Sequence, residues 1–230
     1  MALDLASYDR HMAAAENKAS IPIVGLGAGT HAKSVLDAIR SAGRFEVVAL
    51  VDDDETRAGD ELLGCPIAEP HALERFRTDG VAHAFAGVGG IGDSSARRAV
   101  FERLGAAGFE LPPVIHASAV VSPSARLGPG AQVLAAAVVN ADAEIGEDAI
   151  VNTGAIIEHD CRIGAHAHVA PGARLAGLVT VGEAAHVGIG AIVIESVRIG
   201  DSSLVAAGAV VIRDVPAGAR VGGVPARPLG

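Results

Sequence analysis

Aromatic residues are almost missing from this sequence. Trp is absent, Tyr occurs once and Phe five times, so aromatic side chains make up 3% of the 230 residues. Half of the residues are nevertheless hydrophobic. Because large rings are so scarce, any core has to be built from Val, Ile, Leu and Ala.

Positive charge and long apolar runs are also scarce. The 27 acidic residues outnumber the 18 Lys and Arg residues, which gives a formal net charge of -9 and a pI near 5.4. This balance argues against binding to the phosphate backbone of nucleic acids, which requires a basic surface. No apolar run approaches the roughly 18 residues that span a bilayer, and no signal-peptide pattern opens the chain. We therefore expect neither a nucleic-acid partner nor a membrane partner.

Cysteine is rare as well. Cys65 and Cys161 are the only two cysteines and lie far apart, so a reduced, cytoplasmic protein is the simplest interpretation. Residues 1–20 are polar and rich in Ala, without a strand pattern, and His11-Met12 resembles a cloning junction. We expect this stretch to be a disordered tail or tag, and we exclude it from the fold argument.

The second half of the chain has a period of six. Every sixth residue from Val121 to Val211 is aliphatic without exception, and a small residue usually follows four positions later. A helix cannot satisfy this period, because the apolar stripe would drift around its axis. The period predicts a hexapeptide β-solenoid, in which three hexads close one triangular coil of eighteen residues and coils stack about 4.8 Å apart.

The preceding residues follow a different pattern. Strands are expected at 21–26, 45–51 and 81–88. Helical patterns are expected after the loop at 27–32 and through Ile39, near 68–78, and at 94–107, the last one basic and amphipathic. Alternating strands and helices predict a small, Rossmann-like parallel α/β sheet. Pro112-Pro113 marks the joint. We therefore expect an α/β domain at 21–113 and a solenoid domain at 114–230.

The first strand leads into a partial dinucleotide-binding fingerprint. Gly27-x-Gly-x-x-Ala32 follows the strand, and Asp52 stands at about the right distance to contact a ribose. A tight turn without a ligand would also explain the motif, whereas free amides at a helix start attract phosphate. A single three-strand unit houses a nucleotide-sugar more readily than a whole NAD.

The segment "IIEHDCRIGAHAH" places polar residues on this regular frame. His159 and Asp160 fall at a corner and face outward, whereas Cys161 falls at an inward position and is not expected to be a nucleophile. His168 and His186 are eighteen residues apart at an outward position, so we expect them to stack on successive coils. Surface packing is the expected role of His166 and His186.

Several motifs together resemble the bacterial nucleotide-sugar acetyltransferases of the PglD/NeuD type. They are "GAGTHAKSVLDAI", "LVDDD", "IHASAVVSPSA", "NTGAIIEHDCRIGAHAHVAPGA" and "GGVPARPL", and the resemblance covers about residues 21–229. It implies a left-handed β-helix and a homotrimer. It also implies acetyl-CoA in the cleft between neighbouring prisms and a nucleotide-sugar on the α/β domain.

The resemblance also implies site residues. It gives His159 as the catalytic base, with Asp160 and Asn152 beside it in the catalytic set, and no metal. The remaining residues that it implies are His168, Ile189 and Ala207 for acetyl-CoA and Gly29, Thr30, His31, Asp52, Asp53 and Gly89 for the substrate. Two departures bear on the substrate: Thr30 replaces a Gly common in the loop, and 89–93 read Gly-Gly-Ile-Gly-Asp where the family often has Gly-Asn-Asn.

The expected activity is direct acetyl transfer to the amino group of a UDP- or GDP-linked 4-amino-deoxy sugar, with His159 as general base. O-acetylation of a sugar and a non-catalytic nucleotide-binding scaffold remain alternatives. A zinc carbonic anhydrase of the same solenoid fold would need a His pair separated by four residues, which is missing. Outward apolar residues such as Ile150, Ile156, Ile192 and Leu204 are expected to form the trimer contacts.

Overall fold

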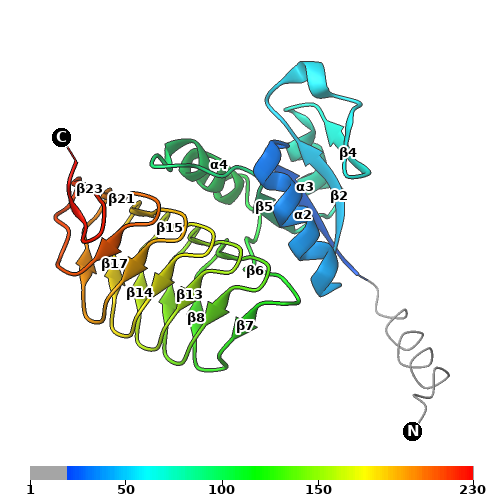
Figure 1. Cartoon of the computed structure of the whole chain (residues 1–230). Helices are drawn as coiled ribbons and strands as arrows, with labels where there is room; N and C mark the ends of the chain where they lie inside the picture. Colours follow the sequence, from blue (N-terminus) through cyan, green and yellow to red (C-terminus); the bar gives the residue numbers. More distant parts are fainter. Residues whose placement is uncertain (1–19, 230) are drawn as a thin grey trace, which may run out of the picture.

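A five-stranded sheet forms the first domain (Figure 1). The structure is a computed structural model and describes residues 20–229, so the expected tail lies outside it apart from Ser20. The sheet order is β3-β4-β2-β1-β5, and all neighbours are parallel except β3 and β4. The strands and helices of this domain are β1 (Ile21–Leu26), α2 (Thr30–Ala42), β2 (Phe45–Val51), β3 (Glu61–Leu62), β4 (Cys65–Ala68), α3 (Ala72–Thr78), β5 (His83–Ala86) and α4 (Ser95–Ala106).

The β3–β4 hairpin is an addition to the three predicted strands. Its two-residue turn, Leu63-Gly64, has positive φ at both positions, as in a type I′ turn. Such turns are usually signalled by Asn-Gly or Asp-Gly, so the hairpin escapes a sequence pattern. The other differences are small: α3 begins at Ala72, and β5 covers His83–Ala86 only.

Helix α2 fixes the geometry of the loop that follows β1. It buries Ala32, Val35, Leu36 and Ile39 against the sheet and against the second domain. It ends at Gly43, which has φ 65° and donates its N–H to the carbonyls of Ile39 and Arg40. Because the buried face of α2 contacts both domains, the N-terminus of the helix lies at the junction between them.

The second domain is a parallel β-helix whose strands are two residues long, apart from β23 with three. Strands eighteen residues apart pair in parallel, as in Ile150 with His168 and His168 with His186. The aliphatic residue of each hexad points inward, and the small residue four positions later is also buried. The predicted solenoid is therefore confirmed. Its strands form three sheets, whose bounds are given next.

The first sheet contains β6 (Val114–Ile115), β9 (Gln132–Val133), β12 (Ile150–Val151), β15 (His168–Val169), β18 (His186–Val187), β21 (Leu204–Val205), β23 (Arg220–Gly222) and the antiparallel β24 (Arg227–Pro228). The second contains β7 (Val120–Val121), β10 (Val138–Val139), β13 (Ile156–Ile157), β16 (Arg174–Leu175), β19 (Ile192–Val193) and β22 (Val210–Val211). The third contains β8 (Arg126–Leu127), β11 (Glu144–Ile145), β14 (Arg162–Ile163), β17 (Thr180–Val181) and β20 (Arg198–Ile199).

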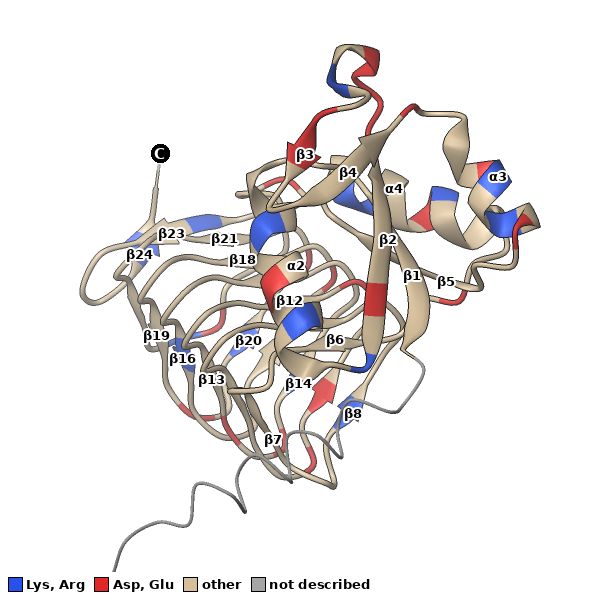
Figure 2. Cartoon of the chain, turned by 90° about the vertical axis from the view of Figure 1, so that its right-hand side faces the viewer, with Lys and Arg blue, Asp and Glu red and all other residues tan. Residues whose placement is uncertain are grey.

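The three outer faces of this prism carry different residues, and Figure 2 marks the positions of the charged ones. The covered face, on the first sheet, packs under the α/β domain, and its Ile150 joins the core of α2. The charged face, on the third sheet, carries Arg126, Glu144, Arg162, Thr180 and Arg198 in register. The apolar face, on the second sheet, carries Val120, Val138, Ile156, Arg174, Ile192 and Val210.

These faces correct the predicted contact set. Ile150 is fully buried within one chain, and Leu204 lies on the same covered face, close to Gly92. The place of a residue within its six-residue repeat determines only whether its side chain faces outward. Its place within the eighteen-residue coil determines on which of the three faces it lies. Of the four predicted residues, only Ile156 and Ile192 lie on the apolar face. Within residues 20–229, no helix has the length and apolar character needed to cross a membrane.

Candidate active site

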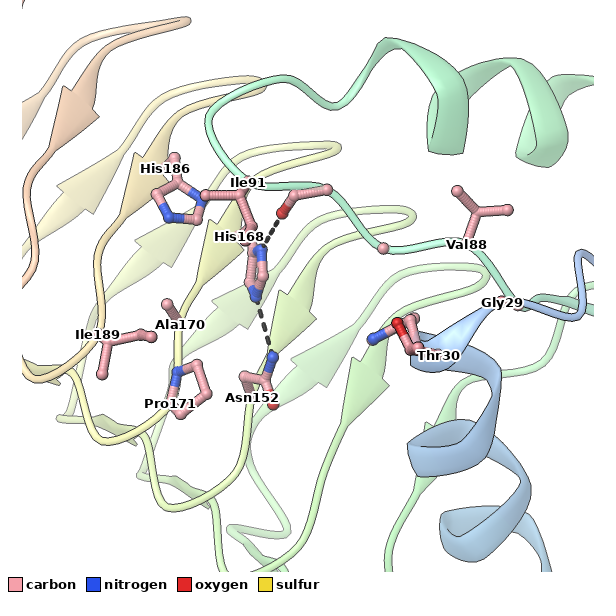
Figure 3. Close-up of a pocket in the computed structure, with 14 residues that line it drawn as sticks. Gly29, Thr30, Val88, Ile91, Asn152, His168, Ala170, Pro171, His186 and Ile189 are labelled. Carbon is pink, nitrogen blue, oxygen red and sulfur yellow. Dashed lines mark hydrogen bonds between the residues drawn. The ribbon is translucent and has the colours of Figure 1, made fainter. Parts of the chain in front are cut away.

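A cavity of about 480 Å³ lies between the two domains (Figure 3). The N-terminus of α2 and residues 87–91 form its wall on the α/β side. On the β-helix side the wall is the covered face and the corner that follows it, with Asn152, His168, His186 and Ile189. The lining is mostly apolar, with a few polar groups that converge on one space, as small-molecule sites require.

His168 has both ring nitrogens occupied. Its Nδ1–H donates to the carbonyl oxygen of Gly90 at 2.8 Å, and the Asn152 amide donates to its Nε2 at 3.0 Å. Because a carbonyl only accepts, these bonds select the neutral Nδ1–H tautomer. Burial lowers the pKa of His168 to about 4. The His186 ring packs edge-on against it, with ring centroids 4.9 Å apart, which confirms the predicted stacking.

His31 is fixed by a residue of the β-helix. Its Nε2–H donates to Oε1 of Gln132 at 2.8 Å, and the Gln132 amide donates to the carbonyl of Ala86 at 2.9 Å. Burial lowers the pKa of His31, so the ring is neutral and its Nδ1 is an acceptor. Gly89 passes so close that a Cβ there would lie 3.0 Å from the His31 ring. The loop can approach His31 only because Gly89 has no side chain.

Asp52 and Asp53 lie in an adjoining cavity of about 360 Å³, which shares Gly29 and Val88 with the first. The Asp52 carboxylate accepts from the backbone N–H of Ala28 at 2.6 Å and from that of Asp54 at 3.0 Å. Asp53 forms an ion pair with Arg103 at 2.7 Å. Asp52 therefore braces the Gly loop.

His159 lies at the corner that follows the apolar face. Its Nδ1–H donates to Oδ2 of Asp160 at 2.9 Å, and the side chain is 55% exposed. The hydrogen bond to Asp160 raises the pKa of His159, and the charges of Asp160, Glu158 and Glu195 act in the same direction. Since Nδ1 holds the proton, the lone pair of the neutral ring is on Nε2. A Cβ at Gly177 would lie 2.7 Å from that atom, so the bare glycine leaves room for the ring.

The structure brings most of the predicted site residues together, with one separation. Gly29, Thr30, His31, Gly89, Asn152, His168 and Ile189 surround the main cavity. Ala207 stands one coil beyond Ile189 at the same corner and is exposed. His159 and Asp160 do not line the cavity, because the apolar face separates their corner from it. Asn152 contacts His168, not His159.

A buried ionic cluster escaped the sequence analysis. Arg97 of α4 contacts Asp148 at 2.9 Å, and His166 contacts the same carboxylate oxygen at 2.9 Å. All three side chains are at most 4% exposed. His186 is buried too, so surface packing was wrong for both histidines: they face out of the β-helix but lie beneath the α/β domain. The spacing of Asp148 and His166 by eighteen residues was a usable signal, whereas nothing marked Arg97 among the Arg residues of α4.

The neutral histidines of the cavity predict acid sensitivity. The folded-state pKa is lowered for His31, His168 and His186, so the unfolded chain binds more protons below pH 6.5. Stability is therefore fully present above pH 6.5 and falls as pH drops toward about 4, with His168 alone contributing about 3 kcal/mol.

Urea unfolding between pH 7 and pH 4.5 measures this loss. His168→Gln should reduce the loss, because no imidazole is then forced to stay neutral at that position. His71→Ala, at an exposed position, is the control and should leave it unchanged. An equal loss in wild type and His168→Gln would contradict the prediction.

Comparisons with known proteins agree with this architecture. Residues 22–104 match the PglD N-terminal domain family, and residues 142–177 match the bacterial transferase hexapeptide (six repeats) family. A comparison with curated proteins gave no match. Within the part of the chain that the structure describes, no three His, Cys, Asp or Glu side chains are grouped to hold a metal ion.

Solved structures extend the match over the whole fold. PerB from Caulobacter crescentus, solved with CoA and GDP-perosamine, is 43% identical, with a TM-score of 0.84 over 91% of this chain and 97% of PerB. The acetyltransferase domain of PglB from Neisseria gonorrhoeae, solved with acetyl coenzyme A, is 35% identical, with a TM-score of 0.83 over 91% and 100%. WeeI from Acinetobacter baumannii is 26% identical, with a TM-score of 0.78 over 90% and 100%. With both of its halves matched and this identity along nearly its whole length, the chain belongs to the PglD-type nucleotide-sugar acetyltransferases, enzymes that join an α/β domain to a left-handed β-helix.

Proposed function

We propose that this enzyme transfers the acetyl group of acetyl-CoA to the amino group of a nucleotide-linked 4-amino-deoxy sugar. The observation that carries the proposal is the 43% identity with PerB, which was solved with CoA and GDP-perosamine, over 91% of this chain. A variant of perosamine N-acetyltransferase from Caulobacter crescentus, solved with the same two ligands, is 44% identical over 91% of this chain. GDP-perosamine is therefore the first substrate to test.

The α/β domain offers a place for the nucleotide. Helix α2 begins at Thr30 with Gly29 as its N-cap residue, and no side chain caps the first N–H groups of the helix. A Cβ at Gly29 would meet no atom within 4 Å, so the space in front of these groups is open. Free amides at a helix N-terminus attract phosphate oxygens. The diphosphate then lies at the start of α2, between the cavity that holds Asp52 and the cavity that holds His168. The sugar extends toward the β-helix.

The β-helix supplies the groups for acyl transfer. As a thioester carbonyl is attacked, an amine must lose a proton and negative charge develops on the carbonyl oxygen. His159 takes the proton on Nε2, with Asp160 holding the ring in the required tautomer. His168, neutral and fixed on both nitrogens, contacts acetyl-CoA, and backbone at Ile189 and Ala207 continues along the same corner. The nitrogen attacks the thioester directly, and CoA leaves as the thiol.

The separation of His159 from the cavity supports a homotrimer. The apolar face lies between the corner of the cavity and the corner of His159, so a neighbour that covers this face meets both corners. Ile192 on this face is 41% exposed in one chain, and Ile194 and Ile212 beside it are 43% and 39% exposed. Burial of such residues drives association. Acetyl-CoA then binds in the cleft between two prisms, next to His159 of one subunit and the cavity of another.

A direct screen tests the proposed substrate. The enzyme is incubated with acetyl-CoA and, separately, with UDP-, GDP-, dTDP- and CMP-linked amino sugars and their hydroxyl counterparts, and the products are analysed by mass spectrometry. We expect an acetyl group on nitrogen for a 4-amino sugar, with GDP-perosamine among the substrates. Acetylation of the hydroxyl counterparts alone would overturn the proposal.

The expected cytoplasmic location rests on the reduced cysteines, Cys65 and Cys161.

A further inference from the structure

The contact between α4 and the β-helix includes a buried charge cluster. Nη1 of Arg97 lies 2.9 Å from Oδ2 of Asp148, and Nη2 donates to the backbone carbonyl of His166 at 2.6 Å. The Nδ1–H of His166 donates to the same Asp148 oxygen. Phe101, one turn after Arg97, packs edge-on against the His166 ring at 5.8 Å. Arg97 and Phe101 of α4 therefore contact residues of two successive coils.

Stability alone does not account for this cluster. Removing charges from water is costly, and a well-packed apolar replacement of a buried ion pair is often neutral or stabilising. Oδ1 of Asp148 and both Nε and Nη1 of Arg97 are also buried without a hydrogen-bond partner within residues 20–229, so Nη1 contacts Asp148 as an ion pair only. The planar guanidinium of Arg97 instead holds its two contacts, the Asp148 carboxylate and the His166 carbonyl, in one relative geometry. The cluster therefore fixes the start of α4 on the coils.

The start of α4 determines the loop that holds His168. Residues 90–94 lead directly into α4, and the loop is tight: Ser95 N–H donates to Asp93 at 2.8 Å, and a Cβ at Gly90 would lie 2.4 Å from the Asp93 carbonyl. Gly90 carries the carbonyl that receives the Nδ1–H of His168. A shift of the first turn of α4 would move this acceptor.

Arg97 also acts on the cavity through its charge. Burial is the main cause that lowers the pKa of His31, His168 and His186, and the nearby guanidinium of Arg97 lowers all three further. The other charged or titratable groups that act on His168 are His186 and His31. A buried cation thus favours the neutral ring that can accept from Asn152.

We propose that Arg97, clamped by Asp148 and His166, is a positioning residue that sets the Gly90 carbonyl and thereby the tautomer and orientation of His168 in the acetyl-CoA site. The part that concerns acetyl-CoA rests on the proposed function. The part that concerns the His168 ring depends only on the contacts of the chain.

The test is the double variant Arg97→Met/Asp148→Asn, which leaves no unpaired charge in the cluster. In ¹⁵N-histidine NMR spectra of the wild type, His168, assigned with His168→Gln, should show a protonated Nδ1. In the double variant this signature should give way to exchange between tautomers. The KM for acetyl-CoA should rise about tenfold, the change expected for the loss of roughly one hydrogen bond to the donor, with the KM for the sugar nucleotide changing much less.

Arg98→Met/Glu183→Gln is the matched control. It removes an exposed pair, 2.7 Å apart, between the next residue of α4 and the β-helix, and should leave the His168 signature and both KM values unchanged. If the double variant fails to fold, Arg97→Lys is measured with the same readouts. This variant keeps the positive charge but lacks the planar guanidinium that contacts two groups at once.

Two results would overturn the inference: an unchanged His168 signature in a folded cluster variant, or equal effects in the cluster variant and the control. If the wild type does not use acetyl-CoA, the proposed function fails, and the NMR comparison alone decides the positioning role.

Discussion

His159→Ala should lower kcat about 10² to 10⁴-fold, the range for losing a general base, while subunit assembly and CoA binding persist. The ring is exposed at a corner and its removal opens no cavity in the β-helix core, so the loss is chemical and not structural. Steady-state kinetics with GDP-perosamine and calorimetry with CoA measure the two effects. His71→Ala, also at an exposed histidine, is the control. A variant that keeps more than about a third of the wild-type kcat would assign the base to another group.

The pH profile identifies the same base independently. Asp160 raises the pKa of His159, and the base works only when unprotonated, so kcat/KM should fall as pH drops through that raised pKa. Asp160→Asn removes the charge and should move the acid limb to lower pH, with a smaller loss of kcat than His159→Ala. An acid limb that stays in place in Asp160→Asn would contradict this assignment.

Ile192→Asp should dissociate the trimer and lower activity at least 10²-fold. The change places a carboxylate on the apolar face, where its burial against a neighbouring subunit is strongly disfavoured. Because the proposed site uses His159 of one subunit and the cavity of another, a monomer should lose catalysis even though its fold is intact. Light scattering gives the assembly, and circular dichroism verifies the fold.

Thr180→Asp is the matched control for this prediction. Thr180 has the same position in its hexad but lies on the charged face, between Arg162 and Arg198. Assembly and activity should be unchanged. A monomeric Ile192→Asp with full activity would exclude a shared site.

Mixed trimers test the sharing directly. His159→Ala and His168→Ala subunits are each expected to be poorly active alone. After joint refolding, some interfaces pair an intact His159 with an intact cavity, so activity should reappear. No recovery in mixed trimers of confirmed composition would place both groups in the same subunit's site.

The period of six residues predicted most of the β-helix, because this period arises from neighbouring residues in the sequence. The chain returns to the core every six residues, and both the aliphatic and the small positions are confirmed as buried. The spacing of eighteen residues between His168 and His186 predicted that they stack, and the two residues do pair in register. The β3–β4 hairpin was missed because β3 is only two residues long and the turn is Leu-Gly.

The errors in the site have a non-local cause. Ile150 and His186 face outward from the β-helix, as predicted, but the α/β domain covers that face. Which of three faces is covered depends on how two domains dock, and the hexad pattern holds no information on this. Arg97 illustrates the same limit: it follows the pattern of a solvated helix yet is buried, because its partners lie 51 and 69 residues further along the chain.

The eighteen-residue register also constrains how such a gene can change in length. Asn152, Ala170 and Gly188 occupy one corner of successive coils, as do His159 and Gly177 at the next corner. Loss or gain of a single codon inside the repeats would shift every later side chain by one position in its hexad, so that the aliphatic residues would leave the inward position. Deletion or duplication of a whole coil would keep all three faces and corners in phase. We therefore expect viable length variation among descendants of this gene to come in whole coils, outside the few coils that carry the reacting groups.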